Sequence, residues 1–237
     1  MKRAAFWFVA AAAAAALTLG LGWWQWGRAQ QKIALHEAIQ QRAALPPVGA
    51  AALAGAHDAD GLLHRRVVLR GQWAAQQTVF LDNRQMDGRQ GFYVVTPLLL
   101  DTGAAVLVQR GWAPRDFRER TKLPEVQTPA GVVAVEGRVA LPPAKLYAFD
   151  PAEQGAIRQN LNVAQFRAET RLPLLELSVQ QTGPASEGLR REWPQPASGA
   201  GKNFGYAFQW WALSGLIAVL YVWFQFVAPR RKSARAR

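Results

Sequence analysis

The sequence predicts a membrane protein in which two transmembrane α-helices, one N-terminal and one C-terminal, flank a single mostly antiparallel, β-rich (α+β) extracytoplasmic domain. The first observation is that residues 4–26 and residues 204–228 are apolar runs without a charge. Each is long enough for the ~20-residue helix that crosses the hydrocarbon core of a bilayer. The second is that short segments between them alternate apolar and polar residues with period two, as half-buried strands do.

Basic residues flank both apolar runs on their outer sides. Lys2 and Arg3 precede the first run, and Arg230, Arg231, Lys232, Arg235 and Arg237 follow the second. Cytoplasmic flanks carry the excess of Lys and Arg, so both termini are expected to be cytoplasmic. The expected organisation is a cytoplasmic N-terminus and first span (1–27), a periplasmic domain (28–203), a second span (204–228) and a basic cytoplasmic tail (229–237). Because no Arg- and Ser-rich transit segment precedes the first span, the pattern favours a bacterial inner membrane.

A cleaved signal peptide is the alternative for the first run, since it also begins with basic residues. The run is long for a signal peptide, and no small-x-small cleavage site follows it before Arg28. Tryptophans at 23, 24 and 26 suit the membrane–water interface. These features favour a retained anchor.

The composition excludes several classes of protein. There is no cysteine, which rules out disulfides, thiol catalysis and thiolate-held zinc or iron–sulfur sites. The formal charge is +12, but seven of the 28 lysines and arginines lie in the two terminal flanks and none of the 16 acidic residues does. The remaining excess is too mild to predict a nucleic-acid-binding face.

The elements between the spans follow from local patterns. The first helix is expected to continue to residue 45, where Pro46 and Pro47 end it, and residues 48–61 to form a short helix and a loop. Alternation predicts strands at 66–73, 77–83, 91–98, 104–110, 132–139, 157–161 and 174–180. Asn162 is the expected N-cap of a helix over 163–170. Residues 115–122 are expected to be an exposed loop, and the Pro- and Gly-containing stretch 182–201 a tether to the second span.

Catalytic patterns are absent from the sequence. No serine sits in a nucleophile elbow, and the histidines at 36, 57 and 64 do not have the spacing of a helical metal pair. We therefore expect no catalytic residue and no metal site. A membrane-tethered periplasmic enzyme, or a binding module of another envelope complex, stays open as an alternative function.

Four blocks carry a resemblance that covers nearly the whole chain. They are residues 22–28, residues 81–84 with 91–98, residues 106–114, and residues 206–210 at the start of the second span. The motif residues are Gly22, Trp24, Gln25, Arg28, Asn83, Arg84, Thr96, Pro97, Arg110, Gly111, Trp112 and Tyr206. In order and spacing these blocks resemble the Surfeit-locus-protein-one family, the Shy-type assembly factors of cytochrome c oxidase.

The resemblance implies a non-enzymatic chaperone of respiratory-chain biogenesis that assists haem a insertion into subunit I of a haem-copper cytochrome c oxidase. Its implied partners are subunit I, other oxidase assembly factors and membrane lipid. The family's candidate haem ligand is a histidine three residues before the tyrosine of the fourth block, where this chain has Asn203. Asparagine is not a usual haem ligand, whereas His, Met, Cys and Tyr are. If haem a is bound transiently, Tyr206 and His36 are the substitute ligands, Trp210 a stacking surface and Arg28 a partner for a propionate.

Polar residues at helical spacing form a stripe along the second span. The stripe consists of Asn203, Tyr206, Trp210, Ser214, Tyr221 and Gln225. Polar groups in a bilayer face protein rather than lipid, so we expect the stripe to contact either an oxidase helix or the first span. For the second case, Ala12, Ala16 and Gly20 would offer a small-residue face.

The remaining motif residues have simple structural interpretations. Arg28 is either a snorkelling interfacial anchor or the propionate partner. Arg84 and Arg110 each end a β segment and are expected to make charge-assisted hydrogen bonds inside the domain. Gly111 is expected to supply a turn, and Trp112 to pack in the core or a loop.

Overall fold

The computed structural model describes residues 2–56, 60–119, 122–143, 146, 155–193 and 199–229. The basic tail and part of the segment 57–61 lie outside these ranges. The chain divides into two compact units, one formed by Met1–Ala38 with Pro196–Arg237 and the other by Ile39–Gln195.

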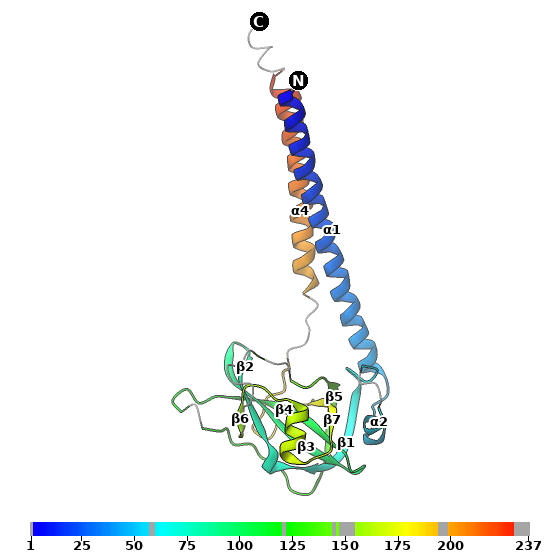
Figure 1. Ribbon diagram of the computed structural model, residues 1–237, viewed down its shortest axis with the longest axis vertical. Helices are drawn as coiled ribbons and strands as arrows, with labels where there is room; N and C mark the ends of the chain where they lie inside the picture. The colour runs from blue at the N-terminus through cyan, green and yellow to red at the C-terminus, as the bar shows by residue number, and fades with distance from the viewer. Residues whose placement is uncertain are drawn as a thin grey trace. The chain divides into compact units, whose positions relative to one another are not determined.

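The first unit is a pair of helices that run side by side (Figure 1). Helix α1 (Lys2–Ala44) pairs with α4 (Ala200–Val222), which continues into the π-helical turn η2 (Trp223–Val227). As predicted, α1 continues without a break beyond the apolar run and ends just before Pro46 and Pro47. It passes into the second unit at Ile39, eleven residues after the expected start of the domain at residue 28.

Both helices carry large apolar side chains that are exposed in this unit. On α1 these include Phe6, Trp7, Phe8, Leu17, Trp23 and Trp24, and on α4 and η2 they include Phe208, Leu216, Val219, Phe224 and Phe226. Both helices have the length and the hydropathy of membrane spans. Exposed apolar side chains on this scale are costly in water.

The second unit is a seven-stranded sheet with two short helices. The strands are β1 (Arg66–Trp73), β2 (Val79–Met86), β3 (Arg89–Leu100), β4 (Ala105–Pro114), β5 (Val132–Ala140), β6 (Ile157–Arg158) and β7 (Leu174–Gln181). Helix α2 (Ala50–Ala54) precedes β1, the 3-10 turn η1 (Ala75–Gln77) follows it, and α3 (Val163–Thr170) lies between β6 and β7. Asn162 caps α3 as predicted, its Oδ1 accepting the Gln165 N–H at 3.1 Å.

The strand order is β1-β5-β7-β4-β3-β2-β6, with an additional pairing of β1 and β3. That pairing joins Gly71 to Leu100 and Trp73 to Leu98, and it closes β1, β5, β7, β4 and β3 into a ring. Strands β2 and β6 extend the sheet from the other half of β3. Most pairings are antiparallel as predicted, whereas β4–β7 and β2–β6 are parallel.

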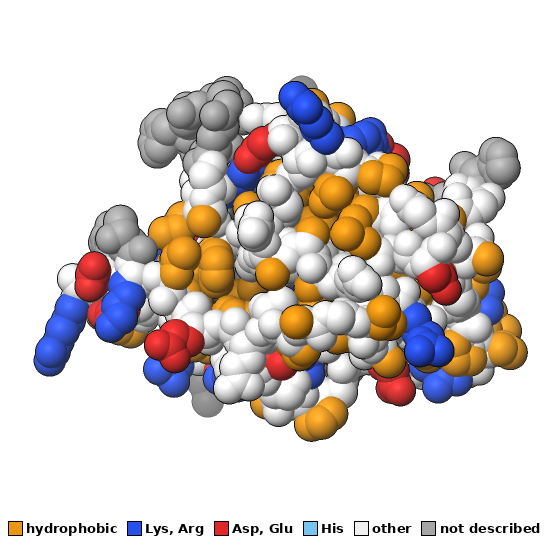
Figure 2. Space-filling model, turned by 90° about the horizontal axis from the view of Figure 1, so that it is seen from below, with side chains coloured by type: hydrophobic (Ala, Val, Ile, Leu, Met, Phe, Trp, Pro, Cys, Tyr) orange, Lys and Arg blue, Asp and Glu red, His pale blue; other side chains and the backbone are white. Residues whose placement is uncertain are grey.

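Apolar clusters hold this sheet together. One contains alternate residues of β1, β3, β4, β5 and β7, with Leu53 of α2 packed among them. A second joins α3, through Val163 and Phe166, to β2, β3 and β4. On the face shown in Figure 2, hydrophobic side chains lie across the middle and charged side chains gather at the rim.

Two predicted segments differ from the structure. The strand expected over 157–161 has only two residues in the sheet, Ile157 and Arg158. The stretch 182–201 is not wholly a tether, because Arg190 pairs with Trp112 of β4 and the side chains of Leu189 and Trp193 are buried. The prolines and glycines of this stretch indicate turns, but two large apolar side chains anchor its first half on the sheet.

Candidate functional site

The interface between α1 and α4 is lined by small residues. Ala29, Gly22 and Thr18 of α1 and Ala207 of α4 are buried there. A Cβ atom on Gly22 would clash with the indole of Trp211. Gly22, a residue of the first block, therefore leaves the space in which the Trp211 indole packs against α1.

The small-residue face that faces α4 is not the one predicted. Ala12, Ala16 and Gly20 are exposed, whereas Ala11, Ala14 and Ala15 are partly buried. Residues 10–16 are all alanine, so the sequence offers small residues on every side and does not choose among them. The contact of Gly22 with the Trp211 indole identifies the face of α1 that meets α4.

Three polar side chains form a hydrogen-bonded clasp between the helices. Lys32 Nζ donates to Asn203 Oδ1 at 2.8 Å, and Asn203 Nδ2 donates to Gln25 Oε1 at 2.6 Å. The carboxamide of Asn203 is thus engaged at both its oxygen and its nitrogen. We call Gln25, Lys32 and Asn203 the polar clasp.

Aromatic rings pack beside the polar clasp. Trp26 lies against Phe204, with ring centroids 4.8 Å apart, and against Trp211 at 5.8 Å. Trp23 makes an edge contact with Trp211 at 5.4 Å. Trp211 is the central ring of this group, and it was not identified as a contact residue from the sequence. Its position four residues after Ala207 and three before Ser214 is the helical spacing that would have identified it.

The residues of the predicted stripe are divided between two environments. Asn203 bonds to α1, Ser214 Oγ donates to the Ala15 carbonyl at 3.0 Å, and the Tyr221 ring contacts Phe8. These three contacts are made with α1, the first span, which is one of the two partners expected for the stripe. Tyr206 is 53% exposed, and Trp210 is partly buried.

Tyr221 and Gln225 line an apolar groove in the helix pair. The groove has a volume of about 590 Å³ and is bounded by Trp7, Ala10 and Ala11 of α1 and by Ile217, Leu220 and Phe224. The π-helical turn η2 forms one end of it. Such turns recur at functional sites in helices.

The residues considered for haem a do not form one site. Arg28 is exposed. His36 lies eleven residues beyond Gln25 on α1, about 16 Å along the helix axis at 1.5 Å per residue. Tyr206 lies on an exposed side of α4, and the Asn203 carboxamide is already satisfied. Among the described residues, these side chains therefore do not fit a site that holds haem a through a protein ligand.

In the β-rich unit the second and third blocks meet. The Trp112 indole Nε1 donates to the Arg84 carbonyl at 2.9 Å, and the Arg84 guanidinium donates to the Gln159 carbonyl and lies over the Tyr93 ring. Burial lowers the pKa of Arg84, and burial raises the pKa of Tyr93. Asn83, at φ 59°, lies where the pairing of β2 with β3 shifts register.

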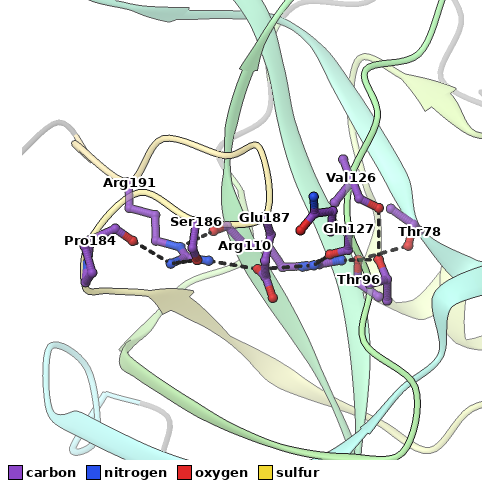
Figure 3. A network of polar contacts seen from close by, with 10 residues as sticks. Thr78, Thr96, Arg110, Val126, Gln127, Pro184, Ser186, Glu187 and Arg191 are labelled. Atoms are coloured by element: carbon purple, nitrogen blue, oxygen red, sulfur yellow. Dashed lines mark hydrogen bonds and ion pairs between the residues drawn. The ribbon is translucent and has the colours of Figure 1, made fainter.

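Arg110 is the most completely buried charged side chain among the described residues, with no exposed surface. It donates to Thr128 Oγ1 at 2.7 Å and to the Gln127 carbonyl at 2.6 Å, and it forms an ion pair with Glu187 at 3.2 Å (Figure 3). Arg191 pairs with the same carboxylate at 2.9 Å. Burial lowers the pKa of Arg110, and Glu187 opposes that shift. As predicted, Arg84 and Arg110 make their hydrogen bonds inside the domain.

The other motif residues of this unit support the sheet. Gly111 does not supply a turn; it lies within β4, where a Cβ would meet the Arg190 carbonyl oxygen at 2.7 Å. The Thr96 and Thr78 hydroxyls are hydrogen-bonded at 2.9 Å. The Pro97 carbonyl accepts the Ala74 N–H at 3.0 Å.

Comparison with known proteins gives consistent matches. The model of the SURF1 family matches residues 12–215. The chain is 25% identical over 215 residues to a SURF1-like protein of Rickettsia felis, covering 86% of this chain and 90% of that protein. It is 35% identical over 117 residues to Surfeit locus protein 1 of Arabidopsis thaliana, covering 44% of this chain and 32% of the relative.

A third relative is the cytochrome oxidase assembly protein SHY1 of Saccharomyces cerevisiae, 29% identical over 93 residues that cover 39% of this chain and 24% of the yeast protein. The matches to the plant and yeast proteins thus span a third or less of those relatives. The family model covers both helices in large part and all of the described sheet. The chain therefore belongs to the SURF1 family.

Proposed function

We propose that this protein is a non-enzymatic assembly factor for cytochrome c oxidase that assists haem a insertion into subunit I. Membership of the SURF1 family carries the proposal, together with the name of the yeast relative, a cytochrome oxidase assembly protein. In this proposal the protein resides in a bacterial inner membrane, with α1 and α4 as its spans, both termini cytoplasmic and the β-rich unit on the periplasmic side.

The helix pair supports a scaffold role rather than a haem carrier. Its outer surface is apolar, and Tyr221, Phe224 and Gln225 line a groove that suits another transmembrane helix. The position where the family resemblance implies a haem-ligating histidine is occupied by Asn203. Its carboxamide is held by Gln25 and Lys32. We propose that the helices dock beside nascent subunit I and favour an open, haem-accepting conformation through contacts that only this conformation makes.

The first test is deletion of the gene followed by measurement of oxidase activity and haem a content in the membranes. Loss of both, with haem a synthesis intact, is the expected result. Unchanged oxidase activity would refute the oxidase as the client.

The second test separates scaffold from carrier. The full-length protein, purified in mild detergent from cells that make haem a, is expected to show no stoichiometric haem a absorption. A stoichiometric band, with the pigment identified after extraction, would contradict the scaffold role and direct attention to Tyr206 and His36.

A further inference from the structure

A pocket on the β-rich unit lies where the chain leaves β4. It has a volume of about 730 Å³ and is lined by Arg89, Pro114–Arg118 and Lys122–Glu125. Its cationic side chains are Arg89, Arg115, Arg118 and Lys122, and its acidic side chains are Asp116 and Glu125. The lining therefore carries an excess of positive charge, supplied mainly by arginine.

The pocket presents an aromatic ring to solvent. Phe117 is 71% exposed, the largest exposed fraction of any large apolar side chain described in this unit. The turn that carries it is held in place, because Asp116 Oδ1 accepts the N–H of Arg118 at 2.8 Å and that of Glu119 at 3.3 Å. A structured turn thus keeps Phe117 out of the core. Burying such a ring on binding is favourable because it removes apolar surface from water.

The walls of the pocket are fixed by the interactions of the second and third blocks. Arg115 pairs with Asp82 of β2 at 3.2 Å. The segment that contains Leu123 and Glu125 continues to Gln127, whose carbonyl accepts a hydrogen bond from buried Arg110. Buried and motif residues therefore position the lining from beneath.

Not all of the cations in the lining are neutralised. Arg115 pairs with Asp82, and Lys122 pairs with Asp116 at 3.7 Å. Within the part of the chain that the structure describes, the guanidinium groups of Arg89 and Arg118 have no hydrogen-bonding or ion-pair partner. Guanidinium groups bind carboxylates in bidentate geometry.

We propose that this pocket is a docking site for an acidic polypeptide segment of a partner protein, which pairs carboxylates with Arg89 and Arg118 and buries Phe117. Arginine and aromatic side chains dominate the binding energy of protein interfaces. A bilayer surface fits less well, because the site is concave and Asp116 and Glu125 would face anionic headgroups. The assignment goes beyond the proposed function and does not depend on the identity of the client.

The test uses the full-length protein in native membranes, with a benzophenone amino acid in place of Phe117. After irradiation, mass spectrometry identifies the crosslinked segment. The same probe at Val132, which is 61% exposed in the same unit, is the matched control. The expected product is one polypeptide segment rich in Asp and Glu that is absent from the Val132 sample.

Charge reversal then tests the pairing. Arg89→Glu with Arg118→Glu is expected to lower the crosslink yield at least tenfold, and Lys substitutions of the partner's acidic residues are expected to restore it. Because both arginines are exposed and unpaired, the double variant is expected to fold, which hydrogen exchange of β3 and β4 checks. Arg89→Gln with Arg118→Gln, without reversed charge, is expected to give an intermediate yield.

The proposal would be overturned if Phe117 crosslinked to lipid alone or to a segment without acidic residues. It would also be overturned if charge reversal left the crosslink yield unchanged, or if the Phe117 product were no stronger than that at Val132. If an acidic partner is found that is neither an oxidase subunit nor an oxidase assembly factor, the docking site stands. The oxidase proposal is then judged separately, by the deletion experiment.

Discussion

Individual polar side chains determine where this protein is sensitive to substitution. Arg110 and Arg191 share the carboxylate of Glu187, and Asn203 joins Gln25 to Lys32. In each case one group contacts two partners, so its loss removes two polar contacts at once. Unpaired polar groups away from water cost more than the lost hydrogen bond itself.

His64 is expected to make the stability of the β-rich unit depend on pH. Burial lowers its pKa from the ordinary value of 6.5, and the positive charges of Arg138 and Arg42 lower the pKa further. The folded state therefore binds this proton less readily than the unfolded state does. The contribution to stability is complete above about pH 6.5 and is lost as the pH falls towards the folded-state pKa.

His64→Asn should flatten this dependence between pH 7 and pH 5. Asparagine also tolerates the left-handed backbone at this position, where φ is 68°. The pH dependence of stability is measured by urea unfolding of the full chain in detergent, monitored by hydrogen exchange of the amides of β1 and β5. Equal pH dependence in the two proteins would show that His64 does not contribute.

Asn203→Ala should weaken the pairing of α1 with α4. The variant leaves Gln25 and Lys32 without their shared partner, and hydrogen bonds between membrane helices are worth about 0.5–2 kcal/mol. The chain has no cysteine, so cysteines at Ala15 and Ser214 can report the pairing through a short thiol crosslinker. We expect a drop in crosslinking of about three- to thirtyfold. Gln209→Ala, which removes an exposed amide from the same helix, should have little effect.

At the scale of the elements, the packing of the two helices at Trp211 depends on one glycine. Gly22→Ala should separate them, because the new methyl group clashes with the Trp211 indole. Overpacking of this kind costs about 1–3 kcal/mol. Gly20→Ala in the same helix meets no atom within 4 Å and is the control, with the same gain in helix propensity.

The same cysteine pair measures the outcome in both variants. Trp211→Ala combined with Gly22→Ala should recover part of the crosslinking, since the clashing ring is removed. If Gly22→Ala and Gly20→Ala behaved alike, close packing at Gly22 would be refuted.

At the scale of the whole β-rich unit, closure of the strand ring depends on β1 pairing with both β5 and β3. Gly71 lies at the crossing, where a Cβ would clash with the Leu99 carbonyl oxygen. Because backbone atoms cannot move aside as a side chain can, Gly71→Ala should destabilise the unit by about 1–3 kcal/mol or more.

The loss of stability should be confined to the pairing of β1 with β3 that closes the ring. Hydrogen exchange in the full chain should accelerate first in residues 71–73 and 98–100, and least in the pairing of β4 with β7. Gly49→Ala, which meets no atom within 4 Å, serves as the control. Uniform acceleration across all strands would show that closure is not a separate structural step.

The sequence alone determined the features that depend on local pattern. Uncharged apolar runs specified the two long helices, alternation located the strands, and Asn162 specified the start of α3. The blocks of motif residues also indicated the family, which the match over residues 12–215 confirmed. Each of these signals lies within a short window of sequence, where helix or strand geometry fixes the side-chain spacing.

Only the tertiary structure decided which distant residues meet. Gln25 and Asn203 are 178 residues apart, and their contact cannot be derived from the spacing within either helix. The alanine-rich stretch left the contacting face of α1 undetermined, and the small-residue face predicted there was wrong. Likewise, the ring closure by β1 and β3 and the meeting of Arg110 with Glu187 depend on long-range packing. Periodicity specifies which side chains share a face, but the opposing face is chosen by the packing of the whole chain.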